Sequence, residues 1–88
     1  AAPKGTAIYA AYNGIVVAAT YSSTMGNYVM IDHGDGLYTI YMHASKLYVK
    51  KDDVVKKGQK IAGVGSTGRS YTLVYVKMVS MYRLGIIL

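Results

Sequence analysis

The chain has no cysteine, glutamate, phenylalanine or tryptophan, and a single proline. Without cysteine, neither a disulfide framework nor a thiolate metal cage can supplement the hydrophobic core. No apolar run approaches the roughly 18–20 residues that a membrane-crossing helix needs, and the first five residues lack the basic and apolar segments of a signal peptide. We therefore expect one small domain over residues 1–88 that is stabilised by its core alone.

Acidic residues are also scarce. Four aspartates stand against ten lysines and arginines, and the resulting net charge of +6 favours an anionic partner such as nucleic acid, an acidic membrane face or a cell-wall polymer. A lysine-rich stretch between residues 50 and 60 also contains two of the aspartates. We interpret it either as a solvated loop of mixed charge or as a contact surface for phosphates or carboxylates.

What the sequence does contain is a series of short runs rich in β-branched residues and tyrosine, separated by glycine-containing turns. Such runs are typical of β-strands, and no long segment repeats apolar residues at helical spacing. The pattern predicts an all-β domain of about seven strands. The expected strands lie near residues 6–10, 14–21, 27–33, 37–43, 46–49, 60–64 and 71–79. Residues 81–88 are either a terminal strand or an interaction segment.

Residues 27–43, NYVMIDHGDGLYTIYMH, contain both histidines of the chain. A tight turn at Asp35-Gly36 would place the two histidines on opposite faces of a hairpin, whereas a three-residue loop over 34–36 would place them on one face, with His43 opposite the first residue of the stretch. Either register separates them by roughly 17–20 Å, and a metal needs each ligand nitrogen within about 2.1 Å. The hairpin therefore cannot hold a metal between its own histidines. His33 is interpreted as a turn-stabilising or surface residue, and His43 as either structural or a general base.

The first 70 residues carry several short motifs in a fixed order. They are Ala-Pro-x-Gly-Thr-x-Ile at 2–8, Asn-Gly at 13–14, Gly-Asn at 26–27, Ile-Asp-His-Gly-Asp-Gly-Leu at 31–37, Thr-x-Tyr-x-His at 39–43, Val-x-x-Gly-Gln-x-Ile at 55–61 and Gly-Ser-Thr-Gly at 65–68. This combination resembles the M23 metallopeptidases, also called LytM or lysostaphin-like domains. A shorter segment, 54–61, also resembles biotinyl and lipoyl carrier domains, although Lys77, the nearest candidate for their modified lysine, lacks flanking turn residues.

The resemblance to M23 domains implies a half-barrel of the barrel-sandwich hybrid type. It also implies a zinc ion, held by two histidines and one aspartate, that cuts the peptide cross-links of bacterial peptidoglycan. In the family, two of these ligands come from a His-x-x-x-Asp motif just before the Ala-Pro segment, and this chain starts after that position. The expected domain is therefore a LytM-like one without the N-terminal metal-ligand segment.

The family's third zinc ligand and one catalytic histidine come from a His-x-His motif after Gly-Ser-Thr-Gly. Thr72 and Val74 stand at the best-aligned positions, and neither side chain can replace a neutral imidazole nitrogen. The resemblance leaves His43 as the candidate catalytic residue and no metal ligand in this chain; His33 matches a recurrent turn residue. The candidate binding residues are Asn27, His33 and Tyr41.

Three functions remain open at this point. The preferred one is a catalytically degenerate domain of the bacterial cell envelope, periplasmic or extracellular, that binds peptidoglycan or activates a cell-wall amidase and needs no cofactor. The second is a fragment, or a misread sequence, of an active zinc endopeptidase. The third is a basic β-barrel that stacks nucleic-acid bases on its tyrosines, although strand tyrosines more often pack against cross-strand neighbours, so we expect no nucleic-acid partner.

Overall fold

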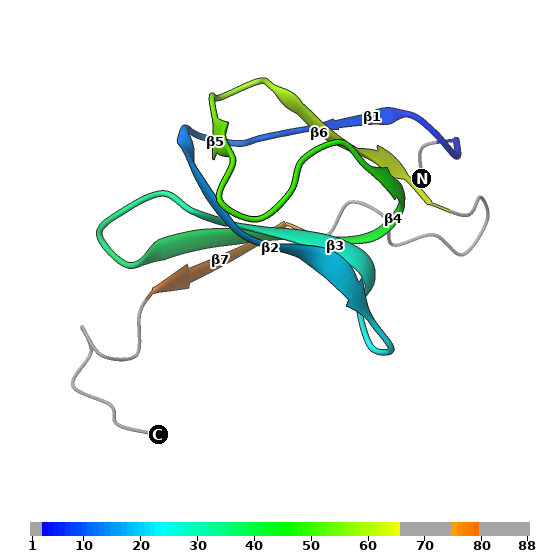
Figure 1. Ribbon diagram of the computed structural model, residues 1–88, viewed down its shortest axis with the longest axis horizontal. Coiled ribbons are helices and arrows are strands. Elements are labelled where there is room, and N and C mark those ends of the chain that lie inside the picture. Colours follow the sequence, from blue (N-terminus) through cyan, green and yellow to red (C-terminus); the bar gives the residue numbers. More distant parts are fainter. Residues whose placement is uncertain (1–2, 66–74, 80–88) are drawn as a thin grey trace.

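A computed structural model describes residues 3–65 and the backbone of a strand at 75–79, and this part consists of strands, turns and loops (Figure 1). The all-β prediction is confirmed, and so is the expected number of strands within the described residues. No helix in those ranges is long and apolar enough to cross a membrane. The strands are β1 (Ala7–Tyr9), β2 (Gly14–Ser22), β3 (Gly26–Asp32), β4 (Leu37–Leu47), β5 (Val54–Val55), β6 (Lys60–Val64) and β7 (Tyr75–Val79).

The strands form one antiparallel sheet in the order β1-β6-β4-β3-β2-β5. Strand β4 changes its neighbour along its length, because residues 37–41 pair with β7 while residues 44–47 pair with β6. Figure 1 shows the result: β1 and β6 cross above the layer formed by β2, β3 and β4. A sheet that changes partners in this way curls over its own face and encloses a core, as the predicted half-barrel requires.

The strand boundaries differ from the expected ones in three places. The runs at 37–43 and 46–49 are one strand, β4, because a single residue with positive φ at His43 bends the chain without ending the pairing. The two-residue strand β5 was not predicted; it pairs with the start of β2 through Gly14↔Val55 and Ile15↔Val54. Of the expected strand 71–79, only 75–79 lies within the described residues, and segment 81–88 lies outside them.

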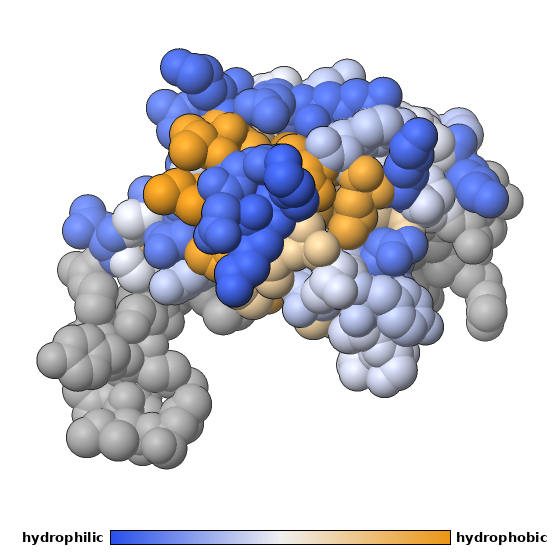
Figure 2. All heavy atoms as spheres, viewed as in Figure 1, coloured by the Kyte–Doolittle hydropathy of each residue, from blue (hydrophilic) through white to orange (hydrophobic). Residues whose placement is uncertain are grey.

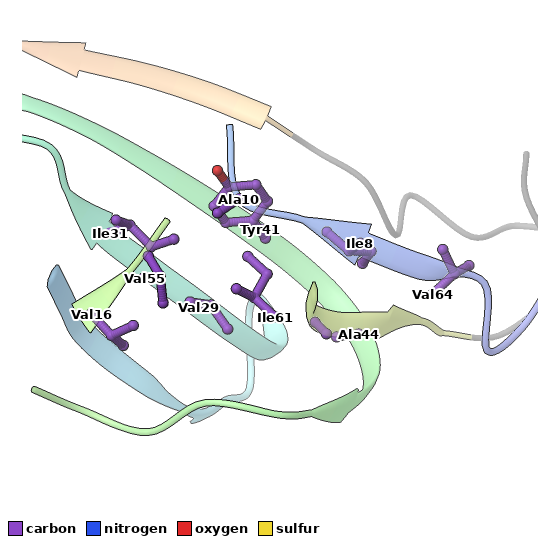
Figure 3. Packing of buried hydrophobic residues seen from close by; sticks show 11 residues of the cluster. Ile8, Ala10, Val16, Val29, Ile31, Tyr41, Ala44, Val55, Ile61 and Val64 are labelled. Carbon is purple, nitrogen blue, oxygen red and sulfur yellow. The ribbon is translucent and has the colours of Figure 1, made fainter. Parts of the chain in front are cut away.

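The core fills the space inside the curled sheet (Figure 3). Side chains from β1, β2, β3, β4, β5 and β6 meet there, so every layer contributes to one continuous cluster. Among the described residues, Thr39 is the one buried polar residue. The cluster consists of Ile8, Ala10, Val16, Val29, Ile31, Tyr41, Ala44, Val55, Ile61, Ala62 and Val64.

Candidate functional site

The β3–β4 hairpin adopts the three-residue loop. The backbone N–H of His33 donates to the Leu37 carbonyl at 2.8 Å, and Asp32 pairs with Tyr38. The alternative with a tight turn at Asp35-Gly36 is therefore wrong. Positive φ angles at 34, 35 and 36 explain the loop sequence, since two of these three residues are glycines and the third is an aspartate, which tolerates this conformation.

At the loop end of the hairpin, both ring nitrogens of His33 have partners. Nδ1 lies 2.6 Å from the Asn13 carbonyl oxygen, and Nε2 lies 2.7 Å from Thr39 Oγ1. The ring also meets Tyr12 edge to face, with centroids 5.4 Å apart. Gly14 makes this approach possible, because a Cβ there would lie 2.9 Å from His33 Nδ1 and 2.5 Å from the Asp32 carbonyl oxygen. The Asn-Gly pair noted in the sequence is thus a close-contact point as well as a turn.

A chain of hydrogen bonds continues from His33 into the core. Thr39 Oγ1 and the Tyr41 hydroxyl lie 2.8 Å apart, and the Tyr41 hydroxyl accepts from the Ala11 N–H at 2.9 Å. Since the Asn13 carbonyl can only accept, Nδ1 of a neutral His33 carries the proton and Nε2 accepts from Thr39. Thr39 has one hydroxyl proton, so Tyr41 must donate to Thr39. The bonds therefore run in one direction, from Ala11 through Tyr41 and Thr39 to His33.

His43 lies near the opposite end of the hairpin, in a bulge. Its φ is +58°, and its backbone N–H donates to the Met25 carbonyl at 2.8 Å. The expected pairing with Asn27 does not form, because the bulge moves Ala44 into that position. Here β4 changes its neighbour from β7 to β6. The imidazole is half-buried, and it forms no hydrogen bond with residues 3–65.

Asn27 stabilises this bulge. Its Nδ2 donates to the Ala44 carbonyl at 3.1 Å and so provides a partner where the strand register shifts. The neighbouring Gly26 has a φ of +67° and lies close to His43. A Cβ added to Gly26 would lie 3.5 Å from Nδ1 of His43. The structure thus places Asn27 beside His43 but His33 and Tyr41 in the other network, so the four candidate site residues divide into two groups.

The described residues contain no group of three or more histidine, cysteine or acidic side chains that could hold a metal ion. His43 supplies one imidazole, which can donate or accept a hydrogen bond but makes at most one ligand to zinc. Thr72 and Val74, at the family's His-x-His positions, lie outside the described residues. Within residues 3–65, His43 therefore has no companion side chains that complete a group of three metal ligands.

The lysine-rich stretch begins with a turn in which Lys50 and Asp53 form an ion pair, with Nζ 3.2 Å from Oδ1. Figure 2 shows hydrophilic residues gathered over this segment between β4 and β5. The Lys50 backbone N–H also donates to Asp53 Oδ2 at 2.9 Å. This backbone hydrogen bond, followed by that from the Lys50 side chain, lowers the pKa of Asp53 below its ordinary value. The turn is joined to β2 by the bond from Val16 N–H to the Asp53 carbonyl.

Two features of the structure were not predicted. One is the role of Thr39, whose place two residues before Tyr41 on a strand puts both side chains on the same face. The other is the convergence of Lys46 and Lys60 on Tyr48. Nothing in the local sequence pattern reports this second contact, because it joins residues from two strands.

Comparison with known proteins places the domain in a family. The profile described as Peptidase family M23 matches residues 1–82, so the chain belongs to this family. It is 45% identical over 69 residues to the peptidoglycan DD-endopeptidase ShyA of Vibrio cholerae, an alignment that covers 78% of this chain and 16% of the relative. It is 38% identical over 79 residues to the murein hydrolase activator NlpD of Salmonella dublin, covering 89% of this chain and 21% of the relative.

Solved structures agree with the fold. The catalytic domain of the antimicrobial peptidase lysostaphin from Staphylococcus simulans superposes with a TM-score of 0.79 and 39% identity, covering 89% of this chain and 62% of that one. A zinc-containing peptidase from Vibrio cholerae gives a TM-score of 0.80 and 38% identity, covering 90% and 25%. The LytM-like half-barrel inferred from the sequence is confirmed. The chain spans less than a quarter of the length of the two curated relatives named above.

Proposed function

We propose that this domain acts in peptidoglycan metabolism in the bacterial cell envelope as a non-catalytic module that binds the wall or activates a cell-wall amidase. The observation that carries the proposal is the set of side chains at the family's catalytic positions. His43 is present, but Thr72 and Val74 stand where the His-x-His motif aligns. A hydroxyl and an alkyl group cannot supply the ligand and base functions of two imidazoles.

The relatives support both parts of this role. Two of them are named as peptidoglycan endopeptidase and murein hydrolase activator, so the same fold is found in proteins that cut the wall and in proteins that activate other hydrolases. The net charge of +6 favours association with a polymer that carries carboxylates. The proposed role uses this attraction and does not use a zinc ion.

The His43 bulge is the proposed contact site for the partner. Its ring has no hydrogen-bond partner from the described residues, and the bulge keeps it at the point where β4 changes neighbours. Asn27 and the bond from His43 N–H to Met25 hold the backbone, so the ring is presented without rearrangement. In this role His43 donates or accepts a hydrogen bond to the partner instead of moving a proton for hydrolysis.

The test is a calorimetric titration of zinc into the chain at neutral pH, with His43→Ala as the control, beside a pull-down with purified peptidoglycan sacculi. We expect no heat of zinc binding at micromolar concentration and retention on sacculi. Stoichiometric zinc binding that His43→Ala abolishes would contradict the non-catalytic role, because it would require a convergent ligand set. Failure to bind sacculi, together with failure to stimulate any wall amidase, would refute the wall-associated function itself.

The second candidate is a part of an active zinc endopeptidase. The specific observation that favours it is the 45% identity to ShyA over a segment that is only 16% of that protein. In such a protein the remaining ligands would come from residues beyond those aligned. The same zinc titration distinguishes the two candidates, because only the endopeptidase requires the metal.

A further inference from the structure

Two lysine side chains converge on one tyrosine at the surface. The Nζ atoms of Lys46 and Lys60 lie 5.2 and 4.3 Å from the centroid of the Tyr48 ring. Tyr48 is 45% exposed, and its backbone N–H donates to the Ile61 carbonyl at 2.9 Å, which fixes it beside β6. Cation–π attraction therefore keeps both ammonium groups close to the Tyr48 ring.

These two cations have no anionic partner among residues 3–65. The ion pair formed in this part of the chain joins Lys50 to Asp53, and the Asp32 carboxylate accepts from the Gly34 N–H. The distances to one shared centroid place the Lys46 and Lys60 nitrogens no more than 9.5 Å apart, which is the sum of 5.2 and 4.3 Å. Two ammonium groups held beside one ring make the potential there positive, so an anion that contacts either of them is attracted by both.

A free aromatic face lies next to the two lysines. Tyr9 is the cross-strand partner of Lys60, and 57% of its surface is exposed. Because directly opposite residues of an antiparallel pair lie on the same face, Tyr9 is a neighbour of the lysine pair. Strands β1, β6 and β4 lie side by side in the sheet (Figure 1). We name the surface formed by Tyr9, Lys46, Tyr48 and Lys60 the Tyr–Lys platform.

We propose that the Tyr–Lys platform binds a glycan strand in which neutral and carboxylate-bearing sugars alternate, as in peptidoglycan strands whose peptides have been removed. A neutral sugar packs its apolar face on Tyr9, and the carboxylate of the next sugar pairs with the ammonium groups of Lys46 and Lys60. The choice of this glycan rests on the proposed function in the cell wall. It adds a site away from His43 and names the part of the wall that the domain holds.

The arrangement favours a glycan over single-stranded nucleic acid. Binding of single strands by stacking needs successive free aromatic faces along the path of the bases. Here ammonium groups lie over the Tyr48 ring, so Tyr9 is the free face of the platform. Lysine is also a point charge that pairs well with a single carboxylate and reads no planar base edge.

The test measures the Kd for peptide-free oligosaccharides of alternating N-acetylglucosamine and N-acetylmuramic acid, at about 0.15 M salt, where surface charge is largely screened. The double variant Lys46→Gln/Lys60→Gln should weaken binding about tenfold or more, as expected for the loss of charge-assisted hydrogen bonds. The matched control, Lys51→Gln/Lys56→Gln, removes the same charge from two other exposed lysines and should change the Kd by less than about twofold.

A second pair of variants tests the aromatic face. Tyr9→Ala should weaken binding about fivefold, whereas Tyr21→Ala, at a tyrosine that is 67% exposed on β2, should leave the Kd unchanged. Oligomers of N-acetylglucosamine alone, which lack the carboxylate, should bind at least about tenfold more weakly than the alternating glycan. Circular dichroism of each variant checks that the sheet is intact.

Three results would overturn the platform. The first is an equal loss in the Lys51/Lys56 control, which would show diffuse charge attraction. The second is equal binding of the uncharged oligomer, and the third is equal binding of polyphosphate or single-stranded DNA through the same lysines. If intact sacculi are bound and the platform variants bind the glycan normally, the platform alone fails. If sacculi are not bound and no wall amidase is stimulated, the proposed function fails independently of these variants.

Discussion

The two histidines of this domain lie in one hairpin and have opposite environments. At the loop end, both ring nitrogens of His33 have hydrogen-bond partners, and one of these bonds leads into the core through Thr39. At the bulge end, the backbone of His43 has a positive φ and is bonded to Met25, while the ring has no partner within the described residues. Within residues 3–65, both ring nitrogens of His33 are hydrogen-bonded and those of His43 are not.

This difference indicates which histidine belongs to the scaffold. A buried or half-buried polar group whose partners are all internal stabilises the fold and has no capacity left for a ligand. A non-glycine residue held at positive φ costs stability, and such positions persist where the surrounding structure enforces them, often at functional sites. The comparison therefore identifies His33 as a residue that joins the β1–β2 connection to the hairpin, and it agrees with the contact that we propose for His43.

The largest expected effect comes from breaking the network on the His33 side. Tyr41→Phe removes the hydroxyl that accepts from Ala11 N–H and pairs with Thr39, so two groups lose a partner in a site where Tyr41 is only 1% exposed. We expect a loss of about 2–3 kcal/mol in the free energy of unfolding, measured by urea denaturation. Tyr21→Phe, at an exposed tyrosine, should change it by less than about 0.5 kcal/mol. Equal effects of the two variants would show that the network contributes nothing.

His33→Ala should have a smaller effect of the same sign. Without the imidazole, Thr39 or Tyr41 keeps one buried hydroxyl proton that has no acceptor, whichever way the two groups turn. The expected loss is about 1–2 kcal/mol. In the unchanged protein, nitrogen NMR of the His33 ring should show the proton on Nδ1. A proton on Nε2 in the neutral ring would contradict the direction of the hydrogen-bond chain.

His43→Gly should have the opposite sign. Glycine adopts positive φ without the steric penalty of a Cβ, so the variant should be more stable than the parent by about 0.5–1 kcal/mol. Retention on peptidoglycan or stimulation of an amidase should fall, because the imidazole is lost. The control is Gly26→Ala, which adds a Cβ to a residue with a φ of +67° and should therefore destabilise the domain. A more stable and fully functional His43→Gly variant would refute the role of this ring.

The sequence predicted the strands far better than the environments of these two residues. Residues 60–64 form a strand with the expected bounds, because β-branched runs and glycine turns act locally. The bulge at His43 was not predicted, since it depends on β4 changing from β7 to β6, which joins distant parts of the chain. The hydrogen bond from Ala11 to Tyr41 spans 30 residues and likewise leaves no local pattern. The motif around His43 made the residue a candidate for the site but did not indicate its backbone conformation.

The smallest expected effect concerns a hydrogen-bonded carboxylate at the surface, Asp53, and its contribution to stability. The Asp53 carboxylate accepts hydrogen bonds from the backbone N–H and the side chain of Lys50, so, like the His33 ring, it has two partners. Unlike His33, it lies on a surface turn where solvent screens the charge. Its folded pKa is lowered, so its contribution to stability is complete above its ordinary pKa of 3.8 and is lost as the pH falls through the lowered folded value.

Lys50→Met removes the side-chain contact and leaves the backbone hydrogen bond, which is the larger cause of the lowered pKa. The pKa of Asp53, followed by carboxyl-carbon NMR, should therefore rise only part of the way toward 3.8 in this variant. A complete return would show that the side-chain ion pair, and not the backbone hydrogen bond of the turn, sets the charge of this group.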